Sequence, residues 1–157
     1  MKMKASLALL GLLLSGLLAA CAAQTGELTP PEIAYGQDLC AACGMLIDQP
    51  GLAAATVDTA GQPHKFDEIG DMIQFHADNP TVQVRAWFVH DYHTEAWLRA
   101  ETAFFVYSPA FLTTMAHGLA AFETEAGALA FAEQQQAEVL SFDEARAALH
   151  AMQPANH

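Results

Sequence analysis

Two stretches of this chain repeat one order of local patterns, and the repeat limits the folds that are open to it. Residues 66–70 (FDEIG) lead into a stretch of helical periodicity that contains Phe75, and residues 122–127 (FETEAG) lead into one that contains Phe131. A stretch typical of a β-strand follows each of them, so the pattern predicts two similar α+β units. The spacing from glycine to phenylalanine differs by one residue between the two, and chance similarity of two amphipathic segments is the alternative.

The first unit is expected to be built around one helix. Residues 69–76 place apolar side chains at helical spacing, and Asp67 lies where a capping residue would stand. Residues 52–58 and 82–92 are rich in strand-forming residues, and residues 63–66 read as the start of a return strand after a turn.

The folded domain is expected over residues 38–153, with units near 38–92 and 93–153. The elements expected in the second unit are a short helical turn at residues 94–98, strands at residues 103–107, 120–123 and 139–142, a loop or hairpin at residues 113–117, and helices at residues 125–135 and 143–152. Ser141 or Asp143 is expected to cap the last helix.

The N-terminus has the three regions of an export signal. Lys2 and Lys4 give a positive start, and residues 5–18 form an apolar run that is too short for a membrane-spanning helix of about 20 residues. Residues 18–21 (LAAC) then place small side chains directly before a cysteine, which resembles the cleavage site of a bacterial lipoprotein. We therefore expect residues 1–20 to be a signal peptide and Cys21 to carry a lipid, with an ordinary secretory signal as the alternative.

Residues 21–37 are expected to form a flexible tether between the lipid and the domain, because this stretch contains Pro30 and Pro31 and shows no periodicity. The lipid would hold the protein at the periplasmic face of a membrane. By analogy with enteric bacteria, alanine at position 22 mildly favours the outer membrane.

The charge of the chain is strongly acidic. The precursor has 6 basic and 18 acidic residues and a net charge of −12, and removal of Lys2 and Lys4 leaves a net charge of −14. Such a chain repels nucleic acid, whose binding depends on basic contacts to phosphate, and it repels anionic lipid head groups. It suits cation capture or docking onto a basic partner, although acidity also serves solubility alone.

Residues 40–45 (CAACGM) place two thiols and a thioether close together. Thiolate and thioether are soft ligands, and soft ligands favour Cu(I) over the hard cations that carboxylates prefer. A disulfide-forming pair has no use for the methionine. Together with the export signal, the segment indicates copper handling outside the cytoplasm.

Three interpretations of Cys40 and Cys43 are open: a structural disulfide, a thioredoxin-like redox pair and a soft metal site. A redox pair is expected at a helix start in a βαβ context, where the helix dipole lowers a thiol pKa. Here a stretch with proline and glycine precedes the pair and Gly44 follows it, which weakens that interpretation. Structural zinc usually takes four ligands, and the sequence has neither a second cysteine pair nor an H-x3-5-H pairing.

The chain resembles the NosL family, the copper-binding lipoproteins of nitrous oxide reductase gene clusters. The matching motifs follow in order: residues 38–47 (DLCAACGMLI), 66–70 (FDEIG), 89–94 (VHDYHT) with Trp97, 103–106 (AFFV), Met115 ahead of Gly118, and 139–142 (VLSF). The resemblance covers nearly the whole of the expected mature chain.

The resemblance implies two similar ββαβ units, in agreement with the repeat. It implies a protein that binds one Cu(I), is not an enzyme, and works with an ABC-type membrane complex that matures the copper enzyme nitrous oxide reductase. Cys43, Met45 and Met115 align with copper ligands, so the site is expected to be shared between the units. Cys40 is either an auxiliary ligand or a disulfide partner of Cys43.

The chain departs from the family pattern at two positions. Ala116 stands where the family usually has glycine after the second methionine, and His117 then follows as a candidate imidazole ligand or a plain loop residue. Asp71 stands where the family often carries a cysteine, so that position cannot bind a soft metal.

Two rival functions follow from these observations. Organomercurial lyase, the nearest fold relative of the family, would need two cysteines from separate segments, and this chain offers one pair. A thiol-disulfide exchange protein would need an exposed thiol of low pKa.

Overall fold

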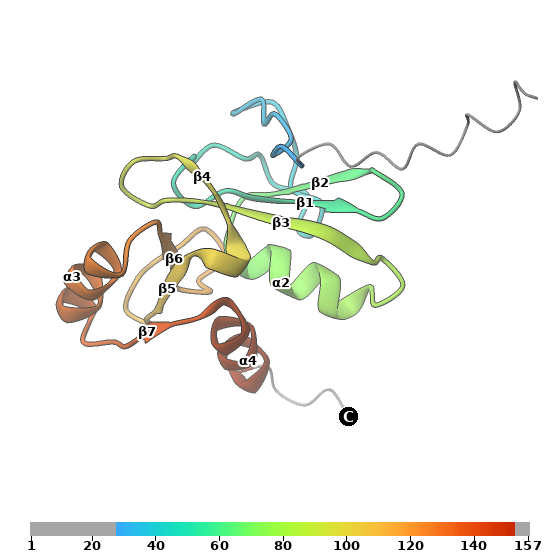
Figure 1. Ribbon diagram of the computed structural model, residues 1–157. Coiled ribbons are helices and arrows are strands. Elements are labelled where there is room, and N and C mark those ends of the chain that lie inside the picture. The colour runs from blue at the N-terminus through green and yellow to red at the C-terminus, as the bar shows by residue number, and fades with distance from the viewer. Residues whose placement is uncertain (1–27, 153–157) are drawn as a thin grey trace, which may run out of the picture.

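The computed structural model describes residues 28–152, and its strands form two antiparallel sheets (Figure 1). The strands of the first sheet, in spatial order, are β2 (Pro63–Phe66), β1 (Ala54–Asp58), β3 (Val84–His90) and β4 (Trp97–Arg99). Those of the second are β6 (Leu119–Phe122), β5 (Phe104–Tyr107) and β7 (Val139–Leu140). The helices are α2 (Ile69–Asp78), η2 (Ala100–Thr102), α3 (Glu125–Gln135) and α4 (Phe142–Met152).

The two units share one topology. In each, the first strand lies at the centre, the second strand pairs with it as a hairpin, and the strand that follows the helix pairs with its other side. The order is therefore ββαβ twice, with β4 added to the first sheet and α4 to the end of the second unit. The predicted α+β fold with two similar units is confirmed.

Helix α2 lies between the first sheet and the second unit (Figure 1). Its apolar face carries Ile69 and Met72, which are buried in one cluster with Phe105 of β5 and Phe142 of α4. This shared core holds the two units together, because separating them would expose apolar surface from both. The start of α2 is thereby fixed against the second unit, and three of the predicted site residues meet beside it.

Several local predictions need correction. Residues 94–98 do not form a helical turn: Trp97 and Leu98 belong to β4, which pairs with β3. The residue at the N-terminal boundary of α2 is Glu68 and not Asp67, and its side chain makes no capping hydrogen bond. The last strand ends at Leu140, since α4 already begins at Phe142.

Of the two predicted caps of α4, Ser141 and Asp143, Ser141 is the one that caps the helix. The backbone N–H of Glu144 donates to Ser141 Oγ at 3.4 Å, and the Ser141 N–H donates back to the Glu144 carboxylate at 2.8 Å. This reciprocal pair is a capping box, which satisfies two backbone donors at the helix start.

The packed structure begins earlier than residue 38. Ile33 is buried in the main core, and the Tyr35 hydroxyl is hydrogen-bonded to His90 Nε2 at 2.9 Å. The expected signal peptide, Cys21 and the first part of the expected tether, residues 22–27, lie outside the described residues. Within residues 28–152, no helix is long and apolar enough to cross a membrane.

Candidate metal centre

A hairpin at residues 36–47 presents the two cysteines. The N–H of Gly36 donates to the Ile47 carbonyl at 2.8 Å, and that of Cys40 donates to the Met45 carbonyl at 2.8 Å. Gly44 turns the chain with φ of +74°, a conformation that glycine adopts without steric cost. The N–H of Ala41 donates to the Lys65 carbonyl at 2.8 Å, which fastens the hairpin to the edge strand β2.

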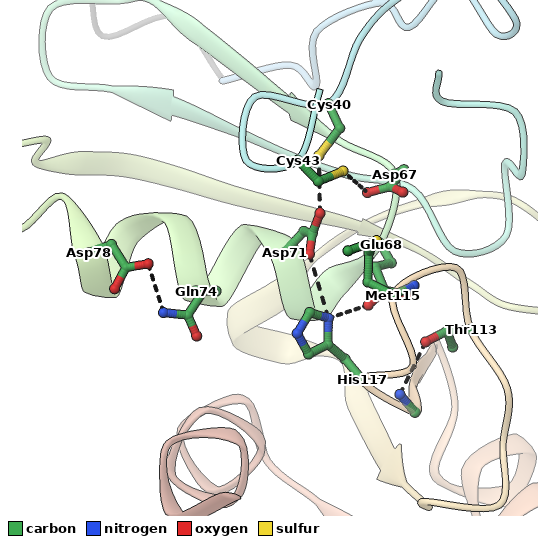
Figure 2. A network of polar contacts seen from close by, with 11 residues as sticks. Cys40, Cys43, Asp67, Glu68, Asp71, Gln74, Asp78, Thr113, Met115 and His117 are labelled. Carbon is green, nitrogen blue, oxygen red and sulfur yellow. Dashed lines mark hydrogen bonds and ion pairs between the residues drawn. The ribbon is translucent and has the colours of Figure 1, made fainter. Parts of the chain in front are cut away.

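The hairpin brings both thiols against two carboxylates from the start of α2. The Cys40 thiol donates to Asp71 Oδ2 at 3.2 Å, and the Cys43 thiol donates to Asp67 Oδ1 at 3.7 Å (Figure 2). One ligand atom from each of these four residues lies within 4.8 Å of the others. Asp67 Oδ2 is buried and has no hydrogen-bond partner, so the cluster keeps an unused acceptor that a cation would satisfy.

The surroundings keep both thiols protonated in the absence of a metal. Burial, followed by the nearby Asp71 carboxyl, raises the pKa of the Cys43 thiol far above its usual range. Burial also raises the pKa of Cys40, against the opposing effect of nearby backbone N–H groups. A thiol-disulfide exchange protein needs the reverse, a thiol of lowered pKa, so the site disfavours that rival. The two thiols are free and not joined by a disulfide.

The second unit contributes a tight loop at residues 113–118. The Ala116 N–H donates to the Thr113 carbonyl at 3.0 Å, and the Gly118 N–H donates to Thr113 Oγ1 at 3.1 Å. The loop places the His117 ring beside the start of α2, with Nδ1 hydrogen-bonded to Glu68 Oε1 and 3.5 Å from Asp71 Oδ1 (Figure 2). The hydrogen bond to Glu68 raises the pKa of His117 against the opposing effect of burial.

Two glycines allow this approach. A Cβ on Gly70 would overlap the imidazole of His117, so only glycine leaves room for the ring against α2. A Cβ on Gly118, whose φ is +66°, would overlap the Ser108 carbonyl oxygen. The loop therefore reaches the first unit only because both positions lack a side chain.

A pocket of about 420 Å³ opens between the two units at this point. Its lining includes Cys43 from the hairpin, Asp71 from α2, and Met115 and His117 from the loop. The structure thus brings three of the five predicted site residues, Cys43, Met115 and His117, to one pocket. Cys40 lies behind it, 3% exposed.

Met45 is the predicted site residue that the pocket does not include. Its side chain is 46% exposed on the hairpin, whereas Met115 is 41% exposed at the pocket. Ligation by any of these residues stays a prediction. A larger cavity of about 450 Å³ lies by the loops around Asp48 and His93 and contains no thiol or thioether.

The sequence did not single out the acidic part of the site. From sequence, Asp67 is a predicted helix cap, Asp71 replaces a soft ligand of the family, and Glu68 has no predicted role. The available signal was the placement of two carboxylates, Asp67 and Asp71, within five residues at the predicted helix start. Only the fold shows that these carboxylates face the hairpin and not solvent.

Ala116 adopts a strained backbone that a glycine would relieve. Its φ is +63°, in the left-handed region where a Cβ costs about 1 kcal/mol. We expect Ala116→Gly to raise the free energy of unfolding by up to about 1 kcal/mol, reduced somewhat by the greater freedom of glycine in the unfolded chain. Urea unfolding measures this, and a loss of stability would show that the alanine methyl group contributes packing that outweighs the strain.

The fold and the site define a class: a two-unit α+β protein with a pocket of soft and nitrogen donors shared between its units. The family model for NosL matches residues 32–150, and the chain therefore belongs to the NosL family. Among solved structures it is similar to the crystal structure of the copper chaperone NosL from Shewanella denitrificans, with a TM-score of 0.66 and 25% sequence identity over 75% of this chain and 96% of that one. No curated protein sequence matches the chain.

Proposed function

We propose that the protein is a Cu(I) chaperone that carries copper for the assembly of nitrous oxide reductase. The observation that carries the proposal is the meeting of a thiol, a thioether and an imidazole from two units at one open pocket. The likeness to a copper chaperone of the same family supports it. The role is one of binding and transfer and involves no chemical conversion of a substrate.

The donor set suits Cu(I). The thiolate of Cys43 and the thioether of Met115 are soft donors, and soft donors select Cu(I) over hard cations. Met45 lies on the same hairpin, and its exposed, flexible side chain could turn toward the metal as a third sulfur. Binding replaces the thiol proton of Cys43 by copper and releases that proton to solvent, so affinity should rise with pH.

The pocket is built for exchange with a partner. Among the residues that the structure describes, six large apolar side chains are strongly exposed, and five of them belong to the two segments that supply Cys43 and Met115 to the pocket. Leu39, Met45 and Leu46 lie on the hairpin, Leu112 directly precedes the loop, and Met115 lines the pocket. Exposed apolar groups on a protein surface indicate a face that another protein covers. A partner that docks there could offer its own ligand to the copper before the metal leaves.

Charge favours a basic partner at this surface. Three of the basic side chains are paired within the chain: Lys65 with Asp38, Arg99 with Glu101 and Arg146 with Asp143. The acidic excess is therefore left to attract a cationic surface and to repel a second copy. Within the proposal, that partner is the ABC-type membrane complex of nitrous oxide reductase maturation or the copper enzyme itself. The chain meets it at the periplasmic face of a membrane, where a lipid on Cys21 anchors the chain. The outer membrane is mildly favoured.

A genetic complementation experiment tests the proposal. In a nitrous-oxide-reducing bacterium that lacks its own NosL-family chaperone, expression of this chain should restore the copper content of nitrous oxide reductase. A Cys43→Ser chain at equal abundance is the matched control and should fail. If the reductase stays copper-poor with the unaltered chain, which still binds Cu(I) in vitro, the proposed destination of the copper is wrong.

A further inference from the structure

Glu68 stands at the N-terminal boundary of α2 and yet does not cap the helix. It is 1% exposed, and its carboxylate crosses to the loop of the second unit. The backbone N–H of Met115 donates to Oε2 at 3.0 Å, and His117 Nδ1 is hydrogen-bonded to Oε1 (Figure 2). One buried carboxylate thus holds both candidate ligand residues of the loop.

Glu68 stands at a position where serine, threonine, aspartate or asparagine usually caps a helix, and its side chain makes no such contact. Burial of a carboxylate is unfavourable without compensating hydrogen bonds. The two contacts to the loop supply that compensation, so the position of Glu68 and the position of the loop depend on each other.

The contact to His117 also selects which ring nitrogen faces the pocket. A carboxylate only accepts hydrogen bonds, so Nδ1 of His117 carries the proton in this contact. Nε2 is then the nitrogen that remains for a metal. In metal sites the partner of the other ring nitrogen fixes both the tautomer and the ring orientation of a ligating histidine.

We propose that Glu68 is a positioning residue of the copper site. It orients the loop of the second unit so that Met115 and His117 line the pocket that Cys43 also lines, and it acts through these residues without binding copper itself. The inference rests on the proposed function, because it concerns the site that would bind Cu(I).

Asp91 provides a matched control elsewhere in the chain. It is also a buried carboxylate that links the two units, since Oδ2 accepts from the Glu123 N–H at 2.8 Å. Its Oδ1 accepts from the N–H groups of His93 and Thr94 at 2.9 and 2.8 Å. It does not line the pocket of the candidate metal centre. Loss of this carboxylate should affect stability alone.

The test compares Glu68→Gln with Asp91→Asn in the reduced, lipid-free protein. Glutamine can still accept the Met115 N–H with its oxygen, but its amide then donates to His117 Nδ1 and forces the proton onto Nε2. We expect Glu68→Gln to weaken Cu(I) binding roughly tenfold or more and to remove the nitrogen donor from the copper X-ray absorption spectrum while sulfur donors remain. Asp91→Asn should lower Tm with no change in affinity or spectrum.

A double variant shows whether Glu68 acts through the ring. In a His117→Ala background, Glu68→Gln should cause no further loss of affinity. Unchanged affinity and spectrum in folded Glu68→Gln would overturn the inference while leaving the proposed function intact. If Glu68→Gln does not fold, the copper X-ray absorption spectrum of His117→Ala is the deciding measurement. A nitrogen donor that remains in the spectrum of His117→Ala would also overturn the inference. Absence of Cu(I) binding by the unaltered protein would overturn both proposals.

Discussion

Replacing Cys43 with serine is expected to abolish tight Cu(I) binding. Removing a residue that hydrogen-bonds a metal ligand typically lowers the metal affinity roughly 10-fold to 100-fold. Removing a soft ligand itself should therefore lower the Cu(I) affinity more than roughly 100-fold. The serine hydroxyl is a hard donor that keeps its proton at neutral pH, so it cannot replace the thiolate. Competition with a Cu(I) chelator under anaerobic conditions measures the change.

The fold should survive this replacement. Cys43 is only partly buried, and serine is nearly equal to it in size. Circular dichroism and Tm should therefore stay close to those of the unaltered protein. Cys40→Ser serves as the comparison, because the buried Cys40 lies behind the pocket and its loss should weaken binding less. Equal affinity of Cys43→Ser and the unaltered protein would defeat the assignment of Cys43.

Replacing Gly70 with alanine is expected to expel His117 from the site. The new methyl group would occupy the space of the imidazole, and the ring could not keep its contacts to Glu68 and Asp71. Overpacking of this kind typically lowers the free energy of unfolding by about 1–3 kcal/mol. Urea unfolding measures the loss, and Cu(I) affinity should fall with it.

His117→Gly provides the control for this prediction, because it removes the atoms that the methyl group would meet. In that background, Gly70→Ala should be neutral or slightly stabilising, since alanine is favoured over glycine within a helix by about 1 kcal/mol. An equal loss of stability in both backgrounds would mean that the space at Gly70 serves something other than the histidine.

The fold could be predicted where local pattern and tertiary structure agree. Helix α3 spans Glu125–Gln135 as predicted, because Thr124 caps it by accepting from the Gly127 N–H. The repeat of two similar α+β units could be predicted because each begins its helix within a similar acidic and glycine-containing motif. Strand β4 could not be predicted because Trp97 and Leu98 take their conformation from pairing with β3, and local sequence patterns do not reveal this pairing.

The site was predicted in part, and the reason for the limit is physical. Cys43 could be proposed as a ligand because two thiols and a thioether in six residues form an unusual soft donor set. Met115 could be proposed by resemblance alone, since an isolated methionine gives no sign of its role. Glu68 lies beside Asp67, and from sequence either residue could cap the helix. Only the approach of His117 decides which carboxylate turns to the second unit.

The central claim is that both units hold the copper, and an anaerobic Cu(I) titration of residues 22–157 against a competing chelator tests it most directly. The unaltered protein should bind one Cu(I) tightly, and Met115→Ala should bind it at least roughly tenfold more weakly. Leu112→Ala, which removes an 82% exposed side chain near the loop, should change nothing. Equal affinity of Met115→Ala and the unaltered protein would show that the first unit binds copper alone, and the account of a shared site would be contradicted.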